Sequence, residues 1–376
     1  MSTPRNAEYT KLYNKKTFLR LLRPSPLSRA EVARRMGLSR AAASLIAEEL
    51  LREGFLTEAP VATPVPSGRP PIALSIAKDA AYALGVYLNR DGCTAGVVSL
   101  AGETVAKARF RLESEGRTEM LAEKLQSLLD ASAVPREKLI GVGVSAPGPL
   151  DMEEGKILNP PRFSLWHGTA LASPLEGALR LPVYVENNAS SLARYHLGKP
   201  EAQGSENFLL LLVDSGIGSG VVLGGKLFYG AAAFTGELGH TTVKLDGRLC
   251  ACGNRGCLEA YAAIPSLLAG TRFSSWEDVV NERLVATDAA ALFEAEAEYL
   301  SAGVVSLANL LALDTVLLSG DLCYEGEAIA SRLSALCNAR ILRRDRTPIA
   351  ILPTHMGKDV KPLAAADIVF DRYLRV

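Results

Sequence analysis

The stretch of sequence that most restricts how this chain can fold is HTTVKLDGRLCACGNRGC, where one histidine and three cysteines gather in a short run. These four side chains are His240, Cys250, Cys252 and Cys257. Thiolate sulfur and imidazole nitrogen are the ligands that Zn²⁺ prefers, and four protein ligands with no open position make a structural site. Glycines between the cysteines let the backbone curl tightly. The run therefore predicts a loop folded around a structural zinc ion.

Two other roles are open to these cysteines. A redox pair is one, although the Cys-x-Cys spacing of Cys250 and Cys252 differs from the Cys-x-x-Cys of thioredoxin-like sites. Buried structural thiols are the other, and three cysteines so close together, with glycines between them, favour a metal. The remaining cysteines, Cys93, Cys323 and Cys337, are scattered along the chain and are expected in the core.

Length and composition narrow the class of protein. The 376 residues suffice for two or three domains. No apolar run is long enough to span a bilayer, and the opening MSTPRNAEYTKLYNKK has no apolar signal core. Six cysteines are too few for a disulfide scaffold. We therefore expect a cytoplasmic protein with no membrane partner.

The charge of the chain is unevenly distributed although its sum is zero. Residues 1–78 hold 13 Lys and Arg against 6 Asp and Glu, and the remainder is acidic by the same margin. A small basic head on an acidic body favours contact between the head and a polyanion. Chance scatter of surface charge is the alternative.

The basic head also has a helical pattern. In LSRAEVARRMGLSRAAASLIAEELLREGFL, Ser28 and Ser39 are placed to cap two helices, and Gly37 supplies the turn between them. This is the pattern of a helix-turn-helix, with an ordinary helical hairpin as the alternative. The expected shared core is Val32, Met36, Leu38, Leu45, Ile46 and Leu50.

In a helix-turn-helix, the start of the second helix faces the major groove of DNA. Here those residues are Ser39, Arg40, Ala41, Ala42 and Ser44. They include only one long polar side chain, so we expect base readout to depend on Arg40 and on DNA shape. The following GFLTEAPVATPVPSGRPPIALSIA predicts two short strands joined by a tip, as in a winged domain. Arg69 at that tip fits a narrow minor groove.

From residue 79 onward, strands and helices alternate, which predicts an α/β body. The strand-turn-strand near residue 82 is weakly echoed near residue 207. This echo predicts two related lobes with a ligand in the cleft between them.

Several motifs of this body resemble those of one known family. FTGELGH followed by CACGNRGCLEAY resembles the signature of the ROK family, named for repressors, open reading frames and kinases. SAPGPLDMEEGKILNPP is similar to its sugar loop, VENNASSLARY to its central catalytic motif, and VDSGIGSGVVLGGKLFYGA to its second phosphate loop. The resemblance covers nearly the whole chain.

The resemblance implies an actin-like, two-lobed sugar-kinase fold behind a winged helix-turn-helix, as in the family's repressors. The winged helix-turn-helix then spans residues 1–78. Lobe 1 spans 79–185, with a C-terminal helix at 357–376 packing back on it. Lobe 2 spans 186–356 and carries the sugar site and the zinc loop.

The family's kinase residues are altered here. Its kinases use an Asp as general base, directly after an Asn that holds the sugar; these positions match Asn187 and Asn188. An amide has no usable basicity near neutral pH. The first phosphate loop, Asp-x-Gly-Gly-Thr in the kinases, also departs: Tyr87 stands at the Asp position, and Asn89, Arg90 and Asp91 replace Gly-Gly-Thr. The resemblance therefore implies no enzyme activity and no ATP cofactor.

The family's sugar contacts are retained. They map onto Glu237, His240 and Glu259, with Asn187, Asn188 and Gly148 completing the set. We therefore expect a sugar-responsive repressor of carbohydrate genes. A sugar or sugar phosphate would close the lobes and change the spacing of two heads in a homodimer or tetramer on an operator.

Two alternatives to this function stay open at the level of sequence. One is an active kinase with an accessory DNA-binding head, for which Glu186 is the nearest substitute base. The other is a sensor whose sugar site has decayed. The sequence names neither the sugar nor the operator, nor whether the sugar releases or strengthens DNA binding.

Overall fold

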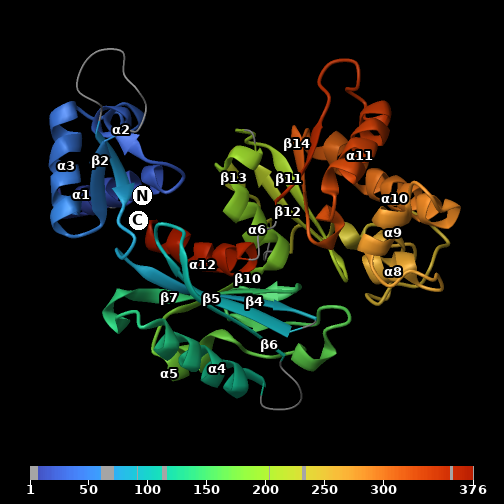
Figure 1. Ribbon diagram of the computed structural model, residues 1–376, viewed down its shortest axis with the longest axis horizontal. Coiled ribbons are helices and arrows are strands. Elements are labelled where there is room, and N and C mark those ends of the chain that lie inside the picture. Colours follow the sequence, from blue (N-terminus) through green and yellow to red (C-terminus); the bar gives the residue numbers. More distant parts are fainter. Residues whose placement is uncertain are drawn as a thin grey trace.

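The computed structural model describes residues 7–60, 72–90, 92–111, 117–202, 204–230, 234–355 and 359–375. Three units are visible in Figure 1: a blue N-terminal unit, a cyan-to-green lobe and a yellow-to-orange lobe. No helix in these described ranges is long and apolar enough to cross a bilayer.

The N-terminal unit is formed by three helices and three short strands, namely α1 (Ala7–Leu22), β1 (Leu27–Ser28), α2 (Arg29–Met36), α3 (Arg40–Arg52), β2 (Leu56–Pro60) and β3 (Ile72–Ile76). The Ser28 hydroxyl accepts the Glu31 amide hydrogen at the start of α2, and the Ser39 hydroxyl accepts that of Ala42 at the start of α3. Gly37 ends α2 in the left-handed region with φ of 65°. The serine caps and the glycine turn therefore lie where the sequence predicts them. The three strands pair in the order β1-β3-β2.

One predicted core residue of this unit is wrong. Leu45 is 64% exposed, whereas Ala43, Ala47 and Leu50 form the buried face of α3. The small alanines let α2 and α3 approach closely, and this choice of buried face turns Leu45 outward. The tip between β2 and β3, with Arg69, lies outside the described residues.

Lobe 1 is built on a five-stranded sheet in the order β10-β7-β4-β5-β6. Its elements are β4 (Tyr82–Asn89), β5 (Gly92–Ser99), β6 (Thr104–Phe110), α4 (Arg117–Ser132), β7 (Leu139–Ala146), β8 (Leu150–Asp151), β9 (Lys156–Ile157), α5 (Ala172–Leu179) and β10 (Val183–Asn187). Strands β4, β5 and β6 form an antiparallel meander, and β7 and β10 continue parallel to β4. The expected boundary between residues 185 and 186 falls inside β10, so this sheet extends to Asn187.

Lobe 2 repeats that plan in the order β13-β12-β11-β14-β15. Its elements are α6 (Asn188–His196), β11 (Phe208–Val213), β12 (Ile217–Leu223), β13 (Lys226–Leu227), α7 (Glu259–Ala262), α8 (Ile264–Leu268), α9 (Trp276–Glu282), α10 (Thr287–Leu311), β14 (Thr315–Ser319), α11 (Gly326–Arg340) and β15 (Ala350–Pro353). An antiparallel meander is again followed by two parallel strands. The echo seen in the sequence thus corresponds to two lobes of the same topology.

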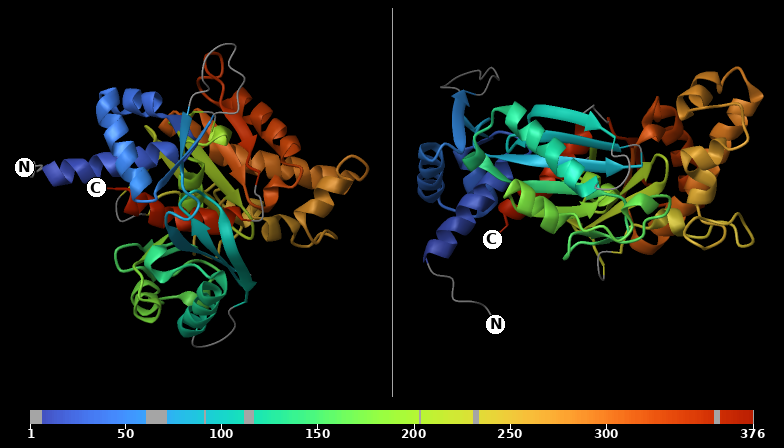
Figure 2. Two further views of the ribbon diagram at one scale, coloured as in Figure 1. Left: turned by 60° about the vertical axis from the view of Figure 1, so that its left-hand side comes forward. Right: turned by 90° about the horizontal axis from the view of Figure 1, so that it is seen from below.

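Helix α12 (Val360–Tyr373) joins lobe 1 to the N-terminal unit. It presses onto β4 and β7 at two glycines, since a Cβ at Gly85 or Gly143 would collide with the α12 backbone. Its far end shares a buried cluster with the N-terminal unit, in which Phe370 and Leu374 pack with Phe18. Figure 2 shows the red helix beside the blue unit in both views. The N-terminal unit therefore rests on lobe 1 through α12.

Candidate functional site

The four predicted metal ligands come together in lobe 2. The ligand atoms of His240, Cys250, Cys252 and Cys257 all lie within 4.8 Å of one another. Cys250 Sγ lies 3.7 Å from His240 Nδ1, and Cys252 Sγ lies 3.7 Å from Cys257 Sγ. A tetrahedral zinc site with Zn–S bonds of about 2.3 Å has sulfur–sulfur edges of about 3.8 Å. The donor set and its spacing therefore fit a four-coordinate metal ion.

Contacts around the cysteines fix the shape of this loop. A Cβ at Gly256, whose φ is 73°, would collide with the carbonyl of Lys244, so glycine is required there. The Tyr261 hydroxyl accepts the Arg248 amide hydrogen at 2.7 Å, and its ring stacks on that of Tyr299 in α10. The loop is thereby held against the body of lobe 2.

The same loop positions two carboxylates. Leu258, between Cys257 and Glu259, donates its amide hydrogen to the carbonyl of Thr241, the residue after His240. This contact joins the two ends of the loop. Glu259 at the start of α7 and Glu237 just before the short turn at His240 line the same cavity.

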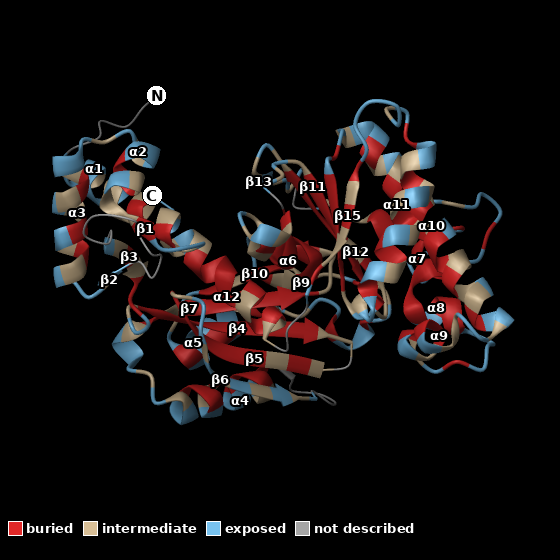
Figure 3. Ribbon diagram, turned by 45° about the horizontal axis from the view of Figure 1, so that its top comes forward, coloured by how far each residue is buried: buried red, intermediate tan, exposed pale blue. Residues whose placement is uncertain are grey.

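A cavity of about 110 Å³ lies between the lobes. All six predicted sugar-site residues line it: Gly148, Asn187, Asn188, Glu237, His240 and Glu259. They come from the loop after β7, from the junction of β10 with α6, and from both ends of the metal loop. In Figure 3, this region between α6, β12 and the lobe 1 sheet is largely coloured as buried. The fold thus brings separate segments of the chain together around one small cleft.

Asn187 shapes one wall of the cleft. Its Oδ1 caps α6 by accepting the amide hydrogens of Ala189 at 2.9 Å and Ser190 at 3.3 Å. A Cβ at Gly148 would lie only 2.7 Å from Asn187 Nδ2 and 3.3 Å from Glu237 Oε1. A side chain at position 148 would therefore displace the polar ends of Asn187 and Glu237 from the cleft.

Of the two cleft carboxylates, Glu259 is buried and Glu237 is half-buried. Glu259 is 4% exposed; its Oε2 accepts the Ile217 amide hydrogen at 2.9 Å, and its buried Oε1 has no hydrogen-bond partner. Burial raises the pKa of Glu237, against the effect of nearby His240 and together with that of Glu259. A buried acceptor without a partner suits a ligand hydroxyl.

Asn188 lines the cleft, but the protein engages both ends of its amide. Its Oδ1 accepts the Ser145 hydroxyl hydrogen at 2.8 Å, and its Nδ2 donates to the Leu88 carbonyl at 3.0 Å. The side chain is thus fixed between β4 and β7 of lobe 1. Neither contact gives it the properties of a base.

Arg90 is a cleft residue whose role sequence reasoning missed. From the end of β4 it donates to the Pro161 carbonyl at 3.1 Å and to the Ser215 carbonyl in lobe 2, and it lies 3.9 Å from Glu259 Oε1. A Cβ at Gly216 would lie just over 3 Å from its guanidinium. An arginine in a loop expected to carry glycine was the available signal, but its reach across the cleft depends on how the lobes meet.

Tyr87, at the other altered position of this loop, is 1% exposed and packs in the core under α12. Lys361 of α12 lies 5.3 Å from the centre of its ring. Burial raises the pKa of its hydroxyl well above the usual value. Asp91 lies outside the described residues.

The predicted DNA-facing residues gather at the start of α3. Ser39, Arg40 and Ala41 are exposed, and Ala42 and Ser44 are partly exposed. Arg34 and Arg35 in α2 pair with Glu31, whereas Arg40 has no ion pair within the described part of the chain. Leu45 and Ala41 together give this face an apolar strip.

Comparisons with known proteins place these features in a family. The model of the ROK family matches residues 83–372. The xylose repressor of Bacillus subtilis (strain 168) is 26% identical over 375 residues, 97% of each chain. The xylose repressor of Caldicellulosiruptor bescii is 28% identical over 338 residues, 84% of each chain.

Solved structures give the same picture. A ROK family transcriptional regulator, described as a homolog of the E. coli MLC protein, matches with a TM-score of 0.79 and 22% identity over 97% of this chain and 98% of its own. The ROK hexokinase of Thermus thermophilus matches with a TM-score of 0.63 and 30% identity over 76% of this chain and 96% of its own. The fold is therefore the mixed α/β, actin-like fold of these proteins.

Proposed function

This chain belongs to the ROK family, and from that premise we propose that it is a sugar-responsive repressor that binds DNA through residues 1–78. The observation that carries the proposal is the match to the xylose repressor of Bacillus subtilis over 97% of both chains, N-terminal unit included. The hexokinase of Thermus thermophilus matches only 76% of this chain.

In this proposal, α2 and α3 are a helix-turn-helix and α3 enters the major groove. Arg40 is placed at its exposed start to contact a phosphate or a guanine edge. Ala41 and Leu45 would contact thymine methyl groups, because exposed apolar side chains on this face suit the one apolar group in the groove. Arg69 at the tip between β2 and β3 would enter the minor groove.

The cleft between the lobes is the proposed sugar site. Asn187 Nδ2, Glu237, Glu259 and His240 offer donors and acceptors to a polyol, with Gly148 and Asn188 completing its walls. With His240 Nδ1 directed at Cys250, its Nε2 is left for a sugar hydroxyl. Xylose is the sugar named in the two repressors above, and N-acetylglucosamine is named in a repressor of Escherichia coli O6:H1 that is 28% identical over 262 residues, 69% of this chain and 64% of its own. Both sugars are candidates.

His240, Cys250, Cys252 and Cys257 would hold Zn²⁺, which supplies a structural cross-link rather than catalysis. The metal would thereby fix the positions of His240 and Glu259. With the loop closed, His240 and Glu259 form one fixed wall of the sugar cleft. Preorganised walls lower the entropy cost of binding a small polyol.

The proposal includes loss of kinase activity. An amide stands at the position of the family's general base, and its hydrogen bonds to Ser145 and Leu88 hold it in the lobe 1 core. The guanidinium of Arg90 covers Gly216 of the second phosphate loop. Glu186, the alternative base, is 1% exposed and pairs with Arg194 at 2.7 Å. These contacts support a cleft that binds sugar without phosphorylating it, with ATP not a cofactor.

Selection of duplexes from a random pool by the full-length protein tests the DNA-binding part, and a thermal-shift panel of sugars and sugar phosphates tests the other. We expect a duplex with two related half-sites, as a homodimer or tetramer would select, and a rise in melting temperature with at least one sugar. Failure to enrich any duplex, or ATP-dependent phosphorylation of the stabilising sugar, would overturn the proposal.

A further inference from the structure

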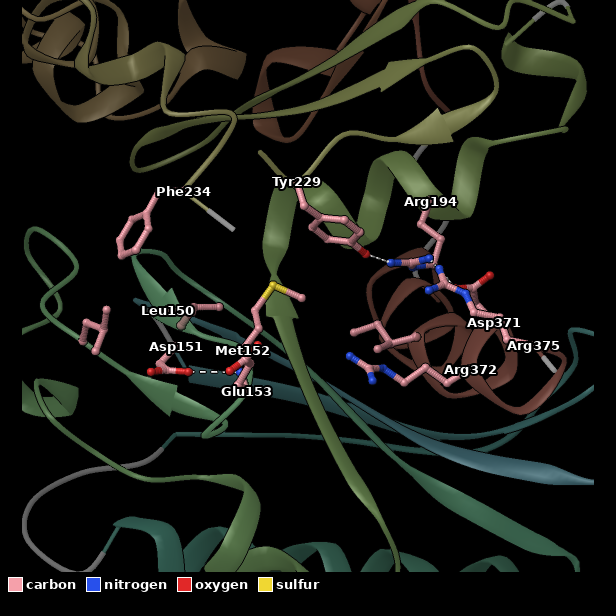
Figure 4. A pocket seen from close by; sticks show the side chains of 12 residues that line it. Leu150, Asp151, Met152, Glu153, Arg194, Tyr229, Phe234, Asp371, Arg372 and Arg375 are labelled. Carbon is pink, nitrogen blue, oxygen red and sulfur yellow. Dashed lines mark hydrogen bonds and ion pairs between the residues drawn. The ribbon is translucent and has the colours of Figure 1, made fainter. Parts of the chain in front are cut away.

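Arg194, in the last turn of α6, is a buried cation whose three partners come from three parts of the molecule. Its side chain is 9% exposed. It donates to Glu186 Oε2 at 2.7 Å and to Asp371 Oδ2 at 2.6 Å, and it contacts the Tyr229 hydroxyl. Figure 4 shows Tyr229 and Asp371 on either side of its guanidinium. Glu186 belongs to lobe 1, Asp371 to α12 and Tyr229 to lobe 2.

On one side, this cluster is joined directly to the proposed sugar cleft. Glu186 is the residue before Asn187 in β10, and Asn187 both lines the cleft and caps α6. Arg194 lies at the other end of that nine-residue helix. Asn187 and Arg194 are therefore connected both through one helix and through one adjacent residue.

On the other side, the cluster reaches the N-terminal unit. Asp371 lies in the last turns of α12, and the end of this helix receives polar contacts from α1. Arg20 donates to the Leu374 carbonyl at 2.6 Å, and Lys16 donates to the Arg375 carbonyl at 3.0 Å. Arg23 also pairs with Asp367 at 2.6 Å. The end of α12 is thus bound to α1, the helix that packs on α2 and α3.

Arg194 also has room and reason to change partners. It lines a cavity of about 450 Å³, bounded by the β8 hairpin at Met152, by Phe234, and by the exposed side of α12 at Arg372 (Figure 4). The buried atoms Glu186 Oε1 and Arg194 Nε have no hydrogen-bond partner. A partly satisfied buried ionic cluster beside open space can adopt a second arrangement.

We propose that Arg194 is the positioning residue that couples the sugar cleft to the DNA-binding unit. Its contacts with Tyr229 and Asp371 would change when the lobes close. The inference rests on the proposed function. The inference goes beyond the proposed function because it names the residues that connect the two sites. Sugar binding and DNA binding would each persist without the contacts of Arg194. Coupling is the ratio of the DNA affinities measured with and without sugar, and the contacts of Arg194 would set that ratio.

The test uses the full-length protein, a selected duplex, and D-xylose or N-acetyl-D-glucosamine, whichever raises the melting temperature. Tyr229→Phe removes the contact between Arg194 and the segment that follows β13, and Asp371→Asn weakens the link to α12 while keeping its shape. Arg194→Met removes the cation, and the two milder variants keep the test decisive if it fails to fold. Glu153→Gln, an exposed residue of the same cavity without an ion pair in the described ranges, is the control.

We expect the duplex Kd of wild type and Glu153→Gln to change at least fivefold at saturating sugar, and that of Tyr229→Phe and Asp371→Asn to change less than twofold. Sugar Kd and sugar-free duplex Kd should stay within threefold of wild type. A full sugar response in both milder variants would overturn the coupling role and leave the proposed function standing. Loss of sugar binding by these variants would also overturn the coupling role. Wild type that binds neither duplex nor sugar would instead overturn the proposed function.

Discussion

The side-chain oxygen of Asn188 accepts a hydrogen bond from the Ser145 hydroxyl, with the two oxygens 2.8 Å apart. This contact and the hydrogen bond from Asn188 Nδ2 to the Leu88 carbonyl fix the amide between β4 and β7, at the position that the resemblance assigns to the base of the family's kinases. It makes Asn188 a part of the lobe 1 core as well as of the cleft wall.

Asn188→Asp alone is not expected to create a kinase. The carboxylate would keep the contact with Ser145 but lose the amide donor to the Leu88 carbonyl, and Arg90 would still cover the second phosphate loop. A coupled assay with MgATP and D-xylose, D-glucose or N-acetyl-D-glucosamine should stay at the buffer rate, with the Thermus thermophilus hexokinase as positive control. Turnover by the variant would mean that catalysis was lost through this one residue.

Cys252→Ser should empty the proposed zinc site. Serine oxygen is a poor replacement for thiolate at a structural zinc, and the loop that carries His240 and Glu259 depends on that site. Metal content should fall well below one zinc per chain, the melting temperature should drop, and sugar affinity should fall at least tenfold. Cys323→Ser, outside the cluster, should leave the zinc content and the sugar affinity unchanged. Full zinc content in Cys252→Ser would show that this cluster is not the zinc site.

Glu259→Gln should weaken sugar binding without unfolding the protein. The amide oxygen can still accept the Ile217 amide hydrogen, but the charged acceptor of the cleft is lost. A hydrogen bond to a charged group contributes about 1.5–3 kcal/mol, so the sugar Kd should rise tenfold or more. Calorimetric titration measures it, with the exposed Glu277→Gln as control. Equal affinities for the two variants would place the sugar elsewhere.

Arg40→Ala should weaken DNA binding. Its guanidinium is exposed at the start of α3 and has no ion pair in the described ranges, so truncation removes a contact without breaking the fold. We expect a loss of about 1–3 kcal/mol if it reads a base, or a salt dependence shallower by about one unit if it contacts a phosphate. Arg52→Ala, at the far end of the same helix, is the matched control. Indistinguishable binding by both variants would argue against α3 as the recognition helix.

The buried His196 predicts a pH dependence of stability. The side chain is 1% exposed, and burial lowers its pKa to about 4. The unfolded chain, with a pKa near 6.5, binds this proton more readily, so stability falls as pH drops from about 6.5 to about 4. At pH 5, this costs the native state about 2 kcal/mol. The melting temperature of His196→Leu should therefore fall less between pH 7.5 and 5 than that of wild type. An identical fall would contradict the assignment.

Local features of this fold were predictable from the sequence, and contacts between distant elements were not. The caps at Ser28 and Ser39 and the cluster around Cys250 depend on neighbours a few residues away. The sequence pattern places Leu45 on the wrong face of α3, because an alanine-rich helix has no clear apolar stripe and small residues form its buried side.

The cleft residues show the same limit. Gly148, Asn187 and Glu259 are far apart in the sequence, and only their resemblance to family motifs brought them together before the fold was known. The roles of Arg90 and Arg194 cannot be predicted from the sequence, because their partners lie on other elements. Only the packing of the lobes brings these partners close.

The affinity of the full-length protein for its selected duplex, titrated with and without saturating sugar, tests the central claim most directly. The account predicts that sugar changes the Kd at least fivefold, the lower end of ordinary coupling between two sites. An unchanged Kd at sugar concentrations that fill the cleft would contradict it.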